Sequence, residues 1–327
     1  MAVTDQLLSE TVSLIADYRR GEINAPDAAH VQKWLAQFDE GQRELLLREV
    51  NHALGRTYIS RNTAEGFLRN LASSQDLTGG DPTNFWTNAK FLNLQTRGRS
   101  QSEFLSLFAG PLKEATGLEL DKCGQTPAVY VYLDDGIFTG MTLIGDLTKW
   151  IQSDAPQQAN IHVIVIAGHA SGRYYAETSL QKAAAAVGKK IALSWWALLH
   201  LEDRKFKTDT SDVLRPTGLP EDARAKAYAA TLKYPPVFRK AGSVGDLKIF
   251  SSEDGRNILE QQLLIKGAHI REIAPNLNKF ARPLGDAVLE TLGFGSTFVT
   301  YRNCPNNAPL AFWVGPPWYP LFPRKTN

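Results

Sequence analysis

The sequence predicts an α/β protein with a parallel-sheet core, an N-terminal helical cap and a mixed C-terminal extension. Strand-like runs rich in apolar residues occur at 129–133, 161–167 and 190–196, and helical patterns separate them. Unbroken β-branched and aromatic runs of this length are typical of strands buried on both faces of a sheet. Strands that alternate with helices indicate a parallel sheet, because each helix returns the chain to the same end of the sheet.

Composition sets the size of the core and excludes some classes of partner. The chain has 327 residues, of which 43% are hydrophobic, enough for a sizeable core with additions at both ends. Its 36 basic and 34 acidic residues give a net charge of +2, which argues against a protein that coats nucleic acid or binds a membrane surface. We expect a helical region at 1–75, the core at 85–205 and a helical or mixed extension with an aromatic tail at 206–327.

Cysteine usage and the absence of long apolar runs indicate the cytoplasm. Cys123 and Cys304 lie far apart without metal-ligand spacing, so neither a disulfide framework nor a zinc site is predicted. The first residues lack the basic and apolar regions of a signal peptide, and runs such as 163–167 are far shorter than a membrane span. We therefore expect a cytoplasmic protein with no membrane partner.

The N-terminal region is predicted to be helical. Apolar residues at helical spacing indicate one helix at 31–38 and a second at 46–54, with a break at 39–41. Ser60 can cap a third helix whose buried face lies at 67–71. No helix here has a basic recognition face, so a cap that packs on the core or on a partner is favoured over a helix-turn-helix.

A short first strand at 91–95 leads into a basic turn. Gly98 permits close approach of the backbone to a ligand, while Arg97 and Arg99 offer charge-assisted hydrogen bonds. Ser100 can cap the helix that follows. Solvated arginines and an anion site are both consistent with this turn.

The centre of the chain is the run 129–133 followed by Asp134, Asp135 and a glycine-containing loop that enters a helix pattern at 143–151. Ligands of an open parallel sheet sit beyond the carboxyl ends of the strands, where two carboxylates can bind vicinal hydroxyls or hold a hydrated Mg²⁺. Backbone N–H groups, threonine hydroxyls and a helix N-terminus favour a phosphate. A plain strand-to-helix turn is the structural alternative. The pattern predicts a ribose 5-phosphate site whose phosphate is held by Thr139, Gly140, Met141 and Thr142.

This order of residues resembles the phosphoribosyl-pyrophosphate (PRPP) motif of type I phosphoribosyltransferases. The resemblance implies a phosphoribosyltransferase-like core in which Asp134 and Asp135 contact the ribose hydroxyls and the Thr139-Gly140-x-Thr142 loop holds the 5-phosphate. It places a pyrophosphate-binding loop at the turn 96–101.

Two features depart from the family pattern. Phe138 replaces an acidic residue that serves as proton acceptor in purine-salvage members, and the hood at 101–128 is short, which leaves less to exclude water.

The next strand, 161–167, ends in a loop that carries His169. At the carboxyl edge of a parallel sheet His169 would lie on the same side as Asp134 and Asp135. There it can contact a phosphate or act as acid or base, or it can be a hydrogen-bonded loop histidine.

The remaining segments are rich in turn formers. We expect 73–84 to be a linker or mobile loop and place a boundary near 205–220. The aromatic tail at 303–322 either packs back as a clasp or lines a base pocket with its Asn amides and Trp rings. Helical patterns occur at 221–232, 257–273 and 281–292, and a strand pattern at 296–301.

Taken together, these segments resemble phosphoribosyltransferase-like proteins of bacterial conflict systems, some of which accompany retron reverse transcriptases. The resemblance implies an effector role in antiphage defence. One hypothesis is a Mg²⁺-dependent transferase or nucleotide-consuming enzyme that uses PRPP or a nucleotide. A second is a catalytically inactive ribose-phosphate sensor, which Phe138 and the short hood favour. A third is a subunit that assembles with a reverse transcriptase and its non-coding RNA, or with copies of itself. The sequence does not determine which base would accept the phosphoribosyl group.

Overall fold

The computed structural model describes residues 3–96 and 98–325, which form two compact units. One unit contains residues 62–200, and the other combines the described residues up to 61 with 201–325. These limits differ from the three consecutive segments expected from the sequence, because the N-terminal helices and the C-terminal extension share one core. Within the described ranges, no helix has both the length and the apolar character needed to cross a membrane.

The unit at 62–200 is built on a four-stranded sheet with the order β2-β3-β4-β5. β2 pairs with β3 and β3 pairs with β4 in parallel, which confirms the predicted parallel sheet. In the register, Asp134 lies opposite Val165, and Ile137 lies opposite Gly168. The strands are β2 (Ala89–Phe91), β3 (Val129–Ile137), β4 (Gln158–His169) and β5 (Lys190–Leu201).

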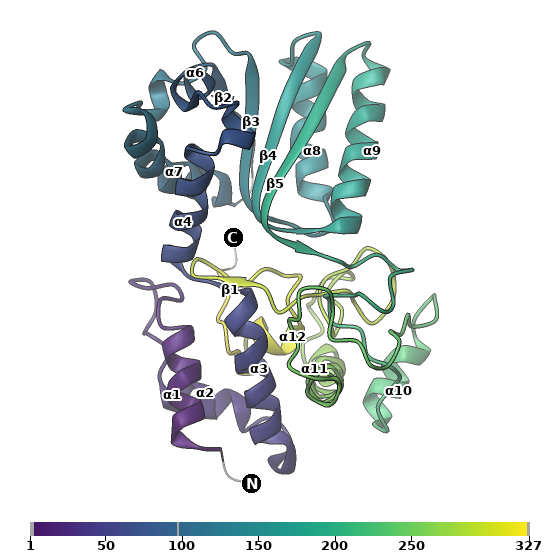
Figure 1. Cartoon of the computed structure of the whole chain (residues 1–327). Coiled ribbons are helices and arrows are strands. Elements are labelled where there is room, and N and C mark those ends of the chain that lie inside the picture. Colours follow the sequence, from purple (N-terminus) through teal and green to yellow (C-terminus); the bar gives the residue numbers. More distant parts are fainter. Residues whose placement is uncertain (1–2, 97, 326–327) are drawn as a thin grey trace. The chain divides into compact units, whose positions relative to one another are not determined.

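Helices α8 (Met141–Ser153) and α9 (Ala170–Ala186) lie on one side of this sheet, and α7 (Ser100–Thr116) lies on the other (Figure 1). Alternate strand residues face opposite sides of a sheet, so Tyr130 and Tyr132 of β3 share a face. Both pack into the core formed with α8 and α9. This places the predicted acid pair directly beyond a well-packed region.

Short helices form in the segment that the sequence predicted to be a linker or mobile loop. The linker expected at 73–84 is wrong, because α5 (Gln75–Thr78) and α6 (Pro82–Thr87) form there. Ser74 accepts a hydrogen bond from the Leu77 amide and Asp81 from the Asn84 amide. The polar residues typical of loops are therefore helix caps in this segment. α4 (Arg61–Ala72) precedes them.

Several element limits differ from the sequence prediction. The first strand forms at 89–91, slightly earlier than the expected 91–95. The predicted helix at 281–292 is wrong, because Gly285 and Gly293 have φ of 108° and 110° and the segment turns instead. The predicted strand at 296–301 is reduced to β6 (Val299–Thr300), which pairs in parallel with β1 (Tyr58–Ile59).

The regular elements of the second unit are mainly helices, long irregular segments join them, and the aromatic tail packs onto the N-terminal segment. The Trp34 indole donates to the Ala311 carbonyl at 2.8 Å, and the Tyr18 hydroxyl donates to the Pro323 carbonyl at 3.0 Å. This confirms the clasp among the two roles considered for the tail. The unit contains α1 (Asp5–Leu14), α2 (Ala28–Leu35), η1 (Glu40–Gln42), α3 (Arg43–Thr57), α10 (Ala223–Ala230), α11 (Glu253–Ile273) and α12 (Leu310–Trp313).

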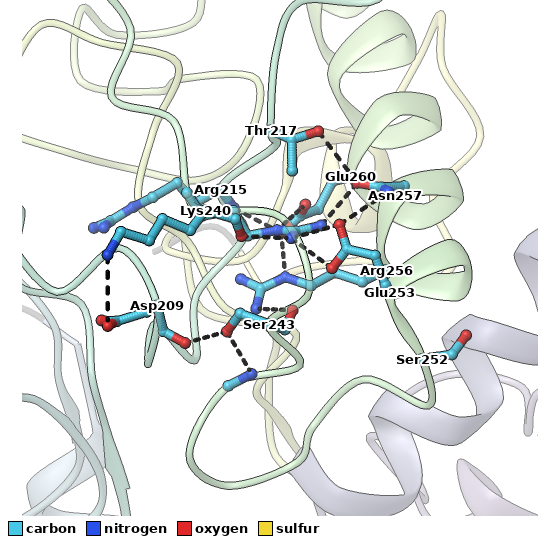
Figure 2. Close-up of polar contacts among 12 residues, drawn as sticks. Asp209, Arg215, Thr217, Lys240, Ser243, Ser252, Glu253, Arg256, Asn257 and Glu260 are labelled. Carbon is cyan, nitrogen blue, oxygen red and sulfur yellow. Dashed lines mark hydrogen bonds and ion pairs between the residues drawn. The ribbon is translucent and has the colours of Figure 1, made fainter.

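A buried charge cluster holds the irregular segment before α11 in place (Figure 2). The Glu260 carboxylate accepts hydrogen bonds from the Arg256 side chain at 2.8 Å, the Arg239 side chain at 3.0 Å and the Arg215 amide at 2.9 Å. Arg215 and Arg256 donate their remaining guanidinium N–H groups largely to backbone carbonyls of residues 203–243. Because these donors are used on the protein's own backbone, the cluster is structural.

Candidate functional site

The acid pair lies within β3, because the strand continues through Asp134 and Asp135 to Ile137. The expected strand end at residue 133 is therefore wrong. Alternation along the strand places Asp134 on the face of Tyr132 and Asp135 on the opposite face. Asp134 is 6% exposed, and Asp135 is partly exposed. The two carboxylates therefore lie on opposite faces of the sheet, close to the end of β3.

A buried tyrosine connects Asp134 to helix α8. The Tyr132 hydroxyl lies 3.4 Å from Asp134 Oδ2 and 3.2 Å from Asp146 Oδ2, so the two carboxylates share its single hydrogen, while Asp134 Oδ1 accepts from the Asp135 amide at 2.8 Å. Burial, and then the charges of Asp134 and Asp146, raise the pKa of Tyr132 above its ordinary value, so the hydroxyl stays protonated. Burial also raises the pKa of Asp146.

The loop after the acid pair presents an open helix N-terminus. Gly140 has a φ of 76° and precedes α8 without a side-chain cap. The Met141 amide donates to Thr139 Oγ1 at 3.4 Å. Met141 is 51% exposed and Thr142 is also exposed. The first N–H groups of a helix lack intrahelical partners, so this end of α8 can bind an anion.

Two glycines let the first turn of α9 pack directly against this loop. A Cβ atom on Gly172 would lie 1.9 Å from the Phe138 carbonyl oxygen, and one on Gly140 would lie 2.7 Å from the Gly172 carbonyl oxygen. Neither position has room for a side chain. The geometry of the loop before α8 is therefore set by contact between two backbones.

His169 lies at the same edge of the sheet, at the end of β4 and immediately before α9. It is 2% exposed, and its ring packs edge-on against Phe138 with the centroids 5.1 Å apart. Phe138 also covers Gly136, where a Cβ would lie 3.0 Å from its ring. The structure therefore places His169 beneath Phe138 and away from solvent.

The basic turn before α7 is only partly described, since Arg97 lies outside the described residues. Gly98 has a φ of 87°, and Arg99 is the residue before α7. The prediction that Ser100 caps α7 is wrong, because Ser100 is the first helical residue. Its hydroxyl and the side-chain amide of Gln95 hydrogen-bond each other at 3.0 and 3.1 Å.

The side chains that could bind a metal ion are scattered in the part of the chain that the structure describes. Within residues 3–96 and 98–325, no group of three or more His, Cys, Asp or Glu side chains is placed to hold a metal. Cys123 and Cys304 are free thiols. Asp134 and Asp135 are the two carboxylates in β3 that precede the loop to α8.

Sequence reasoning missed several residues of this site. Tyr132 resembled any other apolar position of a buried strand, and Asp146 any polar position of a helix. Gly172 follows His169 closely in the sequence, and this spacing was the available signal for a second tight turn. Nothing in the sequence marked Gln101, whose side-chain oxygen accepts from the amides of residues 94 and 95 at 2.9 and 2.8 Å.

Comparison with known proteins identifies the family. A search of curated proteins finds no match to the chain. The family model PRTase-CE matches residues 31–324, which include the sheet, the acid pair, the loop before α8 and most of the second unit. The match covers well over half of the chain and agrees with the parallel α/β core. The chain therefore belongs to the phosphoribosyltransferase-like PRTase-CE family.

Proposed function

We propose that residues 134–142 bind the ribose phosphate of PRPP or of a nucleotide. The observation that carries this proposal is the short loop that joins Asp134 and Asp135 to the left-handed Gly140, which precedes an α8 N-terminus without a side-chain cap. Carboxylates accept hydrogen bonds from sugar hydroxyls, and the helix end attracts the phosphate. Membership of a phosphoribosyltransferase-like family supports the same assignment.

Mg²⁺ fits the donors at this site. Asp134 and Asp135 are hard oxygen ligands, and Mg²⁺ commonly uses one or two carboxylates and takes its other ligands from substrate phosphates and water. The cation would supply charge neutralisation for a pyrophosphate group. The residues of this chain would orient the ribose and exclude water from its buried side.

A second candidate is a ribose-phosphate sensor without turnover. Phe138 occupies the position of the acidic residue that accepts a proton in purine-salvage members. Its ring packs on His169 and over Gly136, so it closes the loop with an apolar surface. Phe138 has no carboxylate, so this position cannot accept a proton from a purine base.

Calorimetry and a turnover assay test the two candidates together. PRPP and nucleoside phosphates are titrated with and without Mg²⁺, and pyrophosphate release is followed with added bases. The double variant Asp135→Asn/Thr139→Ala should lose PRPP affinity by about 100-fold, since each charge-assisted hydrogen bond contributes about 1.5–3 kcal/mol. Asp121→Asn is the matched control, because Asp121 is an exposed carboxylate that pairs with Lys122. Binding that is equal in the double variant and in wild type contradicts the proposal.

We also propose that this site serves an effector in antiphage defence that acts with a reverse transcriptase and non-coding RNA or as a homo-oligomer. The resemblance of the leader, the basic turn, the acid motif and the tail to conflict-system proteins supports this role. Phage plating on cells that carry the gene with its neighbours tests it. Equal protection by wild type and by the Asp135→Asn/Thr139→Ala variant would contradict a role for the site in defence.

A further inference from the structure

Tyr132 places a hydroxyl in the mainly apolar core between the sheet and helices α8 and α9. It lies two residues before Asp134, so both side chains leave β3 on the same side. The side chain is 1% exposed and is surrounded by the core beneath α8 and α9. A phenylalanine would fill this space equally well, whereas a buried hydroxyl is unfavourable unless it is hydrogen-bonded. The hydrogen bonds of the Tyr132 hydroxyl therefore have to offset the cost of burying it.

Those contacts join the two elements that form the proposed site. The hydroxyl reaches Asp134 Oδ2 in β3 at 3.4 Å and Asp146 Oδ2 in α8 at 3.2 Å. The other oxygen of Asp134 accepts the Asp135 amide at 2.8 Å. The Asp134 carboxylate is thus held at one oxygen by a backbone amide and at the other by a hydroxyl whose single hydrogen it shares with Asp146, which restricts its rotation.

We propose that Tyr132 and Asp146 are positioning residues that fix the Asp134 carboxylate and set its spacing from the phosphate end of α8. This inference rests on the proposed ribose-phosphate site. Asp134 would receive a sugar hydroxyl, and the first turn of α8 would receive the phosphate. Since Asp146 lies on α8, the tyrosine hydroxyl connects the sugar side of the ligand to its phosphate side. Misplacement of either group by about 1 Å weakens binding strongly.

Tyr132→Phe removes the hydroxyl and keeps the ring, and Tyr130→Phe is the matched control. Tyr130 lies on the same strand and face, is 9% exposed and packs its ring against Trp150 with the centroids 4.8 Å apart. In calorimetry with PRPP and Mg²⁺, Tyr132→Phe should weaken binding about 10-fold, as loss of a partner that orients a ligand typically does. Tyr130→Phe should change binding less than twofold. Asp146→Ala, which removes the second contact and leaves the tyrosine in place, should weaken binding about threefold.

A double-mutant cycle separates positioning from a general structural effect. In the Asp134→Asn background, Tyr132→Phe should weaken PRPP binding less than twofold, because the carboxylate through which it acts is gone. An equal loss in both backgrounds would overturn the positioning role. Unchanged binding by Tyr132→Phe and Asp146→Ala alongside firm binding by wild type would overturn this inference alone. Absence of PRPP and nucleotide binding by wild type would overturn the proposed function, and this inference with it.

Discussion

Gly172, in the first turn of α9, offers a direct test of how the loop before α8 is held in place. A Cβ at this position would lie 1.9 Å from the Phe138 carbonyl oxygen and 2.8 Å from its carbonyl carbon. Because non-bonded heavy atoms prefer separations near 3.5 Å, Gly172→Ala must displace the loop or the helix by roughly 1.5 Å. Both contacts are with backbone atoms, so rotation of a side chain cannot relieve the clash.

The cost follows from two opposing terms. Overpacking of a close contact destabilises by about 1–3 kcal/mol. Alanine in place of glycine within a helix returns about 0.5–1 kcal/mol. Because the clash is with backbone atoms, the overpacking cost lies at the upper end of this range, and the net loss is about 2 kcal/mol, which lowers the melting temperature of this unit by roughly 4–8 °C. Gly145→Ala in α8 is the control, because nothing lies within 4 Å of its Cβ position; it should stabilise by about 0.5–1 kcal/mol.

Thermal unfolding followed by circular dichroism measures stability, and calorimetry measures PRPP affinity. We expect Gly172→Ala to lose about 10-fold or more in affinity because the loop that we propose to hold the phosphate is displaced. Gly145→Ala should bind as wild type does. A Gly172→Ala protein with the stability and PRPP affinity of wild type would refute the close backbone contact on which this expectation depends.

Three further predictions concern charge. Glu260→Gln should destabilise by about 3 kcal/mol in urea denaturation, because a buried acceptor of two arginines loses its charge; Glu114→Gln, whose side chain is 62% exposed in its ion pair, should change stability by less than about 0.5 kcal/mol. Burial lowers the pKa of His162 below its ordinary 6.5, and its Nδ1 accepts from the Trp196 indole at 3.1 Å. The contribution of neutral His162 to stability is therefore complete above pH 6.5 and is lost as the pH falls below that value. The melting temperature of His162→Gln should depend less on pH than that of wild type, and an equal pH dependence in the two proteins would contradict this. Removal of Mg²⁺ by a chelator should weaken PRPP binding about 10-fold in wild type and much less in Asp135→Asn, and calorimetry that shows equal losses would exclude a role for this carboxylate near the cation.

Hydrophobic pattern predicted most of the sheet-containing unit. The runs at 129–133 and 161–167 are parallel neighbours in the structure, and the expected helices form between them (α8) and after the second run (α9). Pattern was sufficient because buried parallel strands have few polar residues along them. The limits were less accurate, since Asp134 and Asp135 looked like the start of a loop although β3 continues through them.

Local polarity misled the prediction where capping and tight turns decide the structure. Ser74 and Asp81 begin helices in a segment that resembled a linker. Conversely, the apolar residues of 281–292 fit a helix, but Gly285 is held in a left-handed turn where a Cβ would lie 2.0 Å from the Asn307 carbonyl oxygen. Both outcomes depend on contacts with distant residues, which periodicity does not report. The role of the Tyr132 hydroxyl was hidden for the same reason.

The clasp between the two ends of the chain has a consequence for biosynthesis. Arg19 donates to the Pro323 carbonyl at 2.9 Å, so the first helices complete their core only after the tail has left the ribosome. At ordinary translation rates that delay is on the order of 10 to 50 s. During this interval the middle of the chain can fold, while Tyr18, Trp34 of α2 and Tyr58 lack the tail aromatics that pack on them. The nascent N-terminal segment is therefore where a chaperone would act, and where premature termination of synthesis would leave an aggregation-prone product.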